Sequence, residues 1–169
     1  MQLISNTINE QLNALIGQCF SMNRMLDRGM SLLKVRWKMP RTSDILHEEV
    51  AHAYPAEKFA DGISDYQASR GNETIYPATP IGNKNYDTPL EFFKEYFQEN
   101  IKLENMIKDV MDIAEEQGDY TTKVFLESLL NNLAPFTDLS QSLIDIFERD
   151  NSGMYLQMID SNIKKYVNL

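Results

Sequence analysis

The stretch "RGNETIYPATPIGNKNYDTP" (residues 70–89) separates two regions of helical sequence and shows no helical spacing of its own. Glycine, proline and asparagine recur through it, and these residues favour turns and loops over helices. A connection of about twenty residues without secondary structure is long for a compact domain. The length makes sense if the segment runs along a bundle of helices, from the end of one helical pair to the far end of the next.

Two helices are predicted before this crossover. Apolar residues recur at helical spacing from about residue 4 to residue 34. A second helix is predicted over about 43–69, because the side-chain oxygens of residues 42–44 (Thr-Ser-Asp) can cap its start. Pro55 lies inside this second pattern. We expect it to kink or divide the helix, since an interior proline removes a backbone hydrogen bond.

Two further helices are predicted after the crossover. Residues 88–91 (Thr-Pro-Leu-Glu) form a capping box with proline at the first helical position, which indicates a helix over about 89–116. Asp119 follows a glycine-containing break and is expected to cap a helix over about 120–148. A short fifth helix is predicted over about 154–168.

These elements predict one all-α domain over residues 1–169. Two helices, a long crossover and two more helices form a four-helix bundle at about 4–148, followed by the C-terminal helix at about 154–168. One long crossover between the second and third helices is the connectivity of ferritin-like bundles. A chain of this length can bury a substantial core.

The composition excludes several classes of function. A formal net charge of −9 does not favour nucleic-acid binding, and it suits a cationic partner such as metal ions. A single cysteine excludes an intramolecular disulfide framework and fits a reducing compartment. The sequence shows neither a signal peptide nor an apolar run of the roughly 18 residues that a membrane span requires. We expect a soluble cytoplasmic protein.

The stretch "HEEVAHA" (residues 47–53) contains the only two histidines of the chain. In an α-helix Glu49 and His52 share a face, as do Glu48 and His52. A Glu-x-x-His step of this kind turns two side chains onto one ion in helix-bundle metal sites. The pattern predicts a metal site in which His47 or Glu48 assists Glu49 and His52; the alternative is a solvated polar helix face.

Several stretches resemble bacterial non-haem ferritins. They are "INEQLNALI" (8–16), "YQASRGN" (66–72), "TPLEFFKEYFQENIKLENMIKDVMDIAEEQGDYTTKVFLESLL" (88–130) and "SGMYLQMID" (152–160). The resemblance implies an iron-storing or iron-sequestering subunit of a hollow homo-oligomer, with 24 subunits favoured over 12. Surface apolar groups such as Tyr76, Phe92 and Tyr155 are expected at its interfaces.

The resemblance also implies a ferroxidase centre, but the expected ligands depart from the family's pattern. The position on the first helix is Leu15, and the third helix offers Asn100 with Glu99 beside it. On the fourth helix the family's acidic cluster is replaced by Asn131 and Asn132. On the second helix two alignments remain open, one through Glu49 and His52 and the other, seven residues later, through residues 55–59. We therefore expect weak or absent ferroxidase activity.

Two alternatives remain at this point. The chain also resembles the mini-ferritins, which place iron at dimer interfaces, through Trp37, His47, Asp61 and Asp65, although Arg36 stands where a histidine is expected. A fixed cation at that position would repel iron. The resemblance to mini-ferritins is therefore the second choice, after bacterial non-haem ferritins. The other alternative is a structural or assembly protein that keeps the ferritin fold and has lost its metal chemistry.

Overall fold

The computed structural model describes residues 1–52 and 57–167, with the side chain of Glu57 excepted. Within these residues all regular structure is helical, which confirms the predicted all-α class. None of the helices in the described part is long and apolar enough to cross a membrane. The elements are α1 (Asn6–Val35), α2 (Pro40–Leu46), the π-helical turn η1 (His47–Ala51), α3 (Glu57–Ser69), α4 (Pro89–Glu116), α5 (Tyr120–Phe147), α6 (Gly153–Asn162) and the 3₁₀ turn η2 (Ile163–Lys165).

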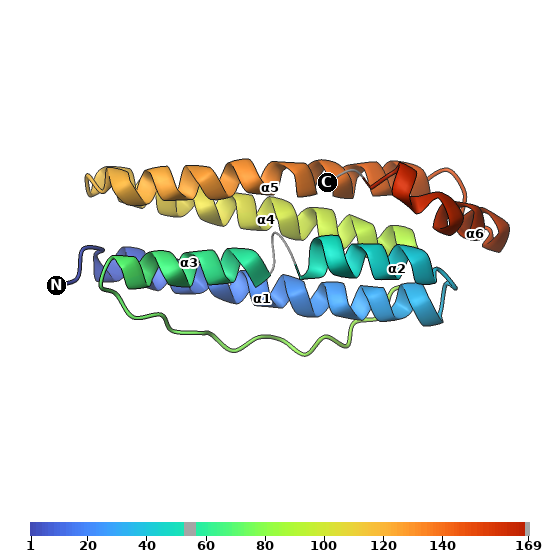
Figure 1. Cartoon of the computed structure of the whole chain (residues 1–169), viewed down its shortest axis with the longest axis horizontal. Helices are drawn as coiled ribbons and strands as arrows, with labels where there is room; N and C mark the ends of the chain where they lie inside the picture. Colours follow the sequence, from blue (N-terminus) through green and yellow to red (C-terminus); the bar gives the residue numbers. More distant parts are fainter. Residues whose placement is uncertain (53–56, 168–169) are drawn as a thin grey trace.

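The helices form an elongated bundle with one long crossover (Figure 1). Helix α1 runs beside the successive elements α2, η1 and α3, while α4 and α5 form the second pair. The crossover leaves the end of α3, follows the outside of the bundle and enters α4 at the opposite end. Side chains of α1 hold it there: Asn9 donates to the Glu73 carbonyl, and Arg28 donates to the Lys84 carbonyl. The predicted path of the crossover is confirmed.

Helices α4 and α5 begin where the sequence predicts. The Thr88 side chain accepts a hydrogen bond from the backbone N–H of Glu91, and the Asp119 side chain accepts one from Thr122. Such side-chain oxygens satisfy N–H groups that have no partner within the helix. Each of these helix starts is determined by a capping residue and the three residues that follow it.

The second predicted helix differs from the structure. It starts at Pro40, earlier than predicted, and Met39 at its N-cap offers no side-chain oxygen. The carboxylate of Asp160 on α6 instead accepts a hydrogen bond from the Thr42 N–H at 2.7 Å. The prediction was wrong here because the cap comes from a residue 118 positions away. The predicted kink at Pro55 lies outside the described residues.

The C-terminal helix also differs slightly. Helix α6 ends at Asn162 and is followed by η2, so the predicted α-helix to about 168 is too long. Residues 168 and 169 lie outside the described residues.

The buried Asp160 has a structural role. Because its carboxylate accepts the hydrogen bond from the Thr42 N–H, it holds α6 against α2.

The core follows the apolar stripes of the four long helices. Of the apolar groups expected on the surface, Tyr76 is exposed, Tyr155 is half-buried and Phe92 is fully buried. The expectation for Phe92 was wrong because its ring lies against Gly29 of α1, where a side chain is absent. The large hydrophobic residues exposed on the crossover are Ile75, Tyr76 and Ile81.

Candidate metal centre

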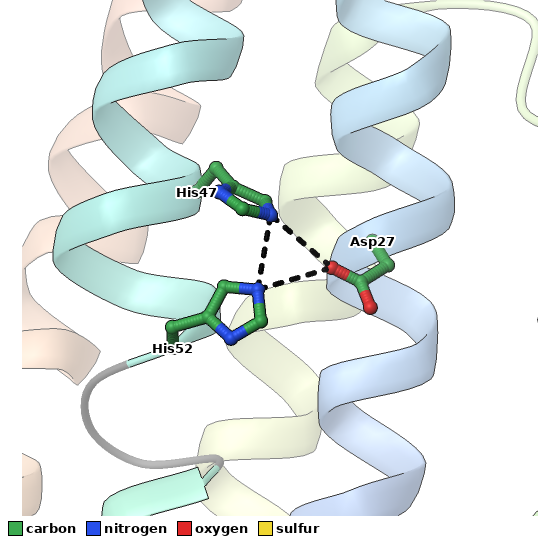
Figure 2. A group of neighbouring side chains, drawn as sticks. All are labelled: Asp27, His47 and His52. Atoms are coloured by element: carbon green, nitrogen blue, oxygen red, sulfur yellow. Dashed lines mark hydrogen bonds and ion pairs between the residues drawn. The ribbon is translucent and has the colours of Figure 1, made fainter.

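Three side chains from two neighbouring elements converge on one point (Figure 2). His47 is the first residue of the π-helical turn η1, and His52 directly follows its last residue. Asp27 faces both histidines from α1. The Nε2 atoms of the two imidazoles are 2.9 Å apart. The Oδ1 atom of Asp27 is 4.0 Å from each of these nitrogens. Two imidazoles and a carboxylate are ligands that divalent zinc and iron accept.

The π-helical turn brings the two histidines together. The backbone N–H of His52 donates to the carbonyl of His47 at 3.2 Å, a bond between residues five apart. In an α-helix, residues five apart point about 140° away from each other. The wider turn of a π-helix brings such residues onto the same face instead, and single π turns occur frequently at functional sites.

Helix α1 holds the π turn in place. The side-chain amide of Asn23 donates to the carbonyl of Ala51 at 2.8 Å, and both groups are buried. Asn23 and Asp27 are one helical turn apart on α1, so the same face supplies an anchor for the turn and a carboxylate for the site. The other carboxylate oxygen of Asp27 lies 3.9 Å from a guanidinium nitrogen of Arg24.

The three side chains are half-exposed. Their exposed fractions are 50% for His47, 45% for His52 and 35% for Asp27. An open surface pocket of about 380 Å³ borders the site, and Asp27 and His47 line it. A hydrated ion could therefore reach the imidazoles without any rearrangement of the bundle.

The other residues predicted as ligands lie elsewhere. Glu48 and Glu49 are exposed, and within the described residues the group of mutually close ligand atoms includes neither. Their pairing with His52 assumed an α-helix, which the π turn replaces. Asp61 and Asp65 are exposed on α3, away from this group. Metal binding by these four carboxylates stays a prediction.

Glu99 is engaged in other contacts. Its carboxylate accepts a hydrogen bond of 2.6 Å from the buried Gln18 side chain, and the Lys102 ammonium lies 3.8 Å away. The Glu99 side chain therefore links α1 to α4.

Two residues of the mini-ferritin pattern have other contacts. Arg36 donates to the Tyr86 carbonyl at 2.9 Å, and Trp37 packs against the core.

Three of the positions where the family resemblance expects a ferroxidase centre are filled by the core, whereas Asn131 and Asn132 on α5 are exposed. Leu15, Phe59 and Asn100 are fully buried. The Asn100 amide donates to the Phe136 carbonyl at 3.4 Å and to the Ser140 hydroxyl at 3.3 Å, which joins α4 to α5. Neutral and apolar side chains of this kind offer no carboxylate or imidazole to a metal ion.

Sequence reasoning identified both histidines but missed Asp27. The spacing of His47 and His52 did not suggest a pair, because five residues is not an α-helical repeat. Asp27 lies on a different helix, and only the register between α1 and η1 brings it to the histidines. No sequence pattern predicts how α1 and η1 are positioned relative to each other along the bundle.

The chain is similar to ferritins in sequence and in structure. A model of the ferritin-like domain matches residues 5–149. Bacterial non-heme ferritins of Bacteroides fragilis strains 638R and YCH46 are each 24% identical over 167 residues, which cover 95% of this chain and 95% of theirs. The solved structure of Chlorobium tepidum ferritin matches with a TM-score of 0.80 and 18% identity, over 97% of this chain and 99% of that one. Since the match covers residues 5–149, which is well over half of the chain, the chain belongs to the ferritin-like family.

Proposed function

We propose that this chain is an iron-storing or iron-sequestering subunit of a hollow homo-oligomer, with 24 copies favoured over 12. The observation that carries the proposal is the match to the ferritin-like domain over residues 5–149, which covers the whole four-helix bundle. The net charge of −9 supports it, because carboxylates attract iron cations and can nucleate an iron mineral.

We further propose that oxidation of iron at the middle of this bundle is slow or absent. Leu15 and Asn100 stand where the family resemblance expects ligands, Phe59 does so in one of the two alignments of the second helix, and all three are fully buried. A di-iron centre needs several carboxylate and imidazole ligands together. Iron would then be oxidised by oxygen in solution, or by a competent subunit with which this chain co-assembles.

Iron loading tests the proposal. The purified metal-free protein is given ferrous iron in air, separated from free iron by gel filtration, and analysed for iron and protein. We expect iron to co-elute with the assembly at many ions per chain. Oxygen uptake should be close to that of the same amount of ferrous iron in buffer without protein. Rapid oxygen uptake would show that an oxidation centre operates in this chain.

The burial of neutral and apolar residues at the expected ligand positions also fits a second function. A ferritin fold whose middle lacks metal ligands could serve only in assembly, as a structural or interaction protein. That protein would stay colourless in the loading experiment, without the many iron ions per chain expected of a storage subunit. The two functions therefore give opposite results in one measurement.

A further inference from the structure

We propose that Asp27, His47 and His52 form a mononuclear site for a divalent transition-metal ion such as Zn²⁺, Co²⁺ or Fe²⁺. The site is separate from the family's position in the middle of the bundle and does not depend on iron storage. Their ligand atoms all lie within 4.8 Å of one another, and they form the one such group found among the described residues. Two imidazoles with one carboxylate bind zinc and ferrous iron and leave positions for water.

The distances suit a single ion. Two nitrogens bound at about 2.0–2.1 Å to one ion, at angles of about 90–110°, lie about 2.9–3.4 Å apart. The separation between the His47 and His52 Nε2 atoms is 2.9 Å. The Asp27 oxygen, at 4.0 Å from both nitrogens, needs to approach by no more than about 1 Å. A half-exposed aspartate can do so by rotating its side chain.

The backbone of the π turn is arranged so that the two histidines can share one ion, while Val50 and Ala51 of the same turn pack into the core. The π turn is needed to align His47 with His52, and Asn23 satisfies its Ala51 carbonyl from α1. A bound ion would tie α1 to the π turn through side chains of both elements.

The site lies far from the family's ferroxidase position. Leu15 marks that position on α1, and Asp27 follows it by twelve residues. At 1.5 Å per residue the two are about 18 Å apart along the helix axis. With three protein ligands, the trio can hold one ion, whereas the family's centre holds two.

Access and surrounding charges are compatible with a cation. The bordering pocket of about 380 Å³ opens to solvent, and it is lined by Lys34 and Asp44 as well as by Asp27 and His47. The Lys34 ammonium is occupied by Asp44, at 2.6 Å. The Arg24 side chain is 59% exposed, and a guanidinium nitrogen lies 3.9 Å from Oδ2 of Asp27, the oxygen that does not face the histidines.

The test uses zinc and the full-length protein without iron, so that it is independent of the storage function. Zinc binding to metal-free protein is measured at pH 7.5 by competition with a chromophoric chelator, and the ring protons of the two histidines are followed by NMR. We expect one zinc per chain, with both histidines shifting together up to one equivalent. His47→Ala and His52→Ala should each weaken binding at least about 100-fold, and Asp27→Asn about tenfold.

Matched controls separate this site from the alternatives. Glu48→Ala and Glu49→Ala remove neighbouring carboxylates and should change the affinity less than about threefold. Far-ultraviolet circular dichroism should be the same for all five variants, since all five side chains are at least one-third exposed. If His47→Ala binds zinc as tightly as the parent, or if Glu49→Ala abolishes binding, the proposal is wrong. Iron loading can fail or succeed without affecting either result.

Discussion

At the scale of single residues, two helical glycines have different surroundings. A methyl group built at Gly29 of α1 would lie 2.1 Å from two ring atoms of Phe92, whereas one at Gly62 of α3 would meet nothing within 4 Å. Gly29 is therefore required where α1 and α4 approach each other. Gly62 is not required by packing, and alanine is the better helix former there.

We predict opposite effects of alanine at these two glycines. Gly29→Ala should lower the free energy of unfolding by about 1–3 kcal/mol, because overpacking outweighs the gain in helix propensity. Gly62→Ala should raise it by up to about 1 kcal/mol. Guanidinium denaturation at a fixed protein concentration measures both. Equal effects of the two substitutions would mean that α1 does not approach Phe92 in this way.

Cys19 provides a second residue-scale test. It is the only cysteine, it is fully buried on α1, and burial raises the pKa of its thiol well above the ordinary value. Since thiolate is the reactive form, we predict negligible reaction with a disulfide reagent at pH 8 in the folded protein. One thiol per chain should react in denaturant. Rapid labelling without denaturant would contradict the packing of α1.

At the scale of elements, α2 depends on α6 for its first turn. Asp160 accepts the Thr42 N–H, and Met39 at the N-cap offers no side-chain acceptor. We predict that Asp160→Ala lowers the free energy of unfolding by about 1–2 kcal/mol, the usual cost of a lost cap. Asp138→Ala, at an exposed position on α5, should change it by less than about 0.5 kcal/mol. A similar effect of both variants would rule out the capping role.

Elements governed by local signals could be predicted from the sequence. The crossover over residues 70–89 and the caps at Thr88 and Asp119 each depend on adjacent residues, and the structure confirms them. The start of α2 could not be predicted, because its cap comes from Asp160. The same limit applies to the candidate site. His47 and His52 are visible in the sequence, but their pairing needs a π turn and Asp27 needs the register of α1.

At the scale of the whole molecule, the ferritin-like bundle is kept while its middle is filled by core residues. We predict that Leu15→Glu alone does not create ferroxidase activity, because one carboxylate does not make up for the neutral Asn100 and the other missing ligands. The buried carboxylate should instead lower the free energy of unfolding by about 3 kcal/mol or more. Oxygen uptake with ferrous iron and denaturant titration measure the two effects. A large gain in oxygen uptake would show that a nearly complete centre exists.

The crossover exposes three apolar side chains along one side of the bundle: Ile75 is 68% exposed, Tyr76 57% and Ile81 83%. Exposed apolar groups that gather in this way mark interfaces. We predict that sedimentation velocity at micromolar concentration gives a species far heavier than the 19.5 kDa chain, and that Ile81→Lys shifts it to smaller species with unchanged helix content. Gln98→Lys adds the same charge at an exposed polar position of α4 and should leave the mass unchanged. A stable monomer of the parent chain would refute the proposed assembly, and it would show that a single chain tolerates these apolar side chains in water.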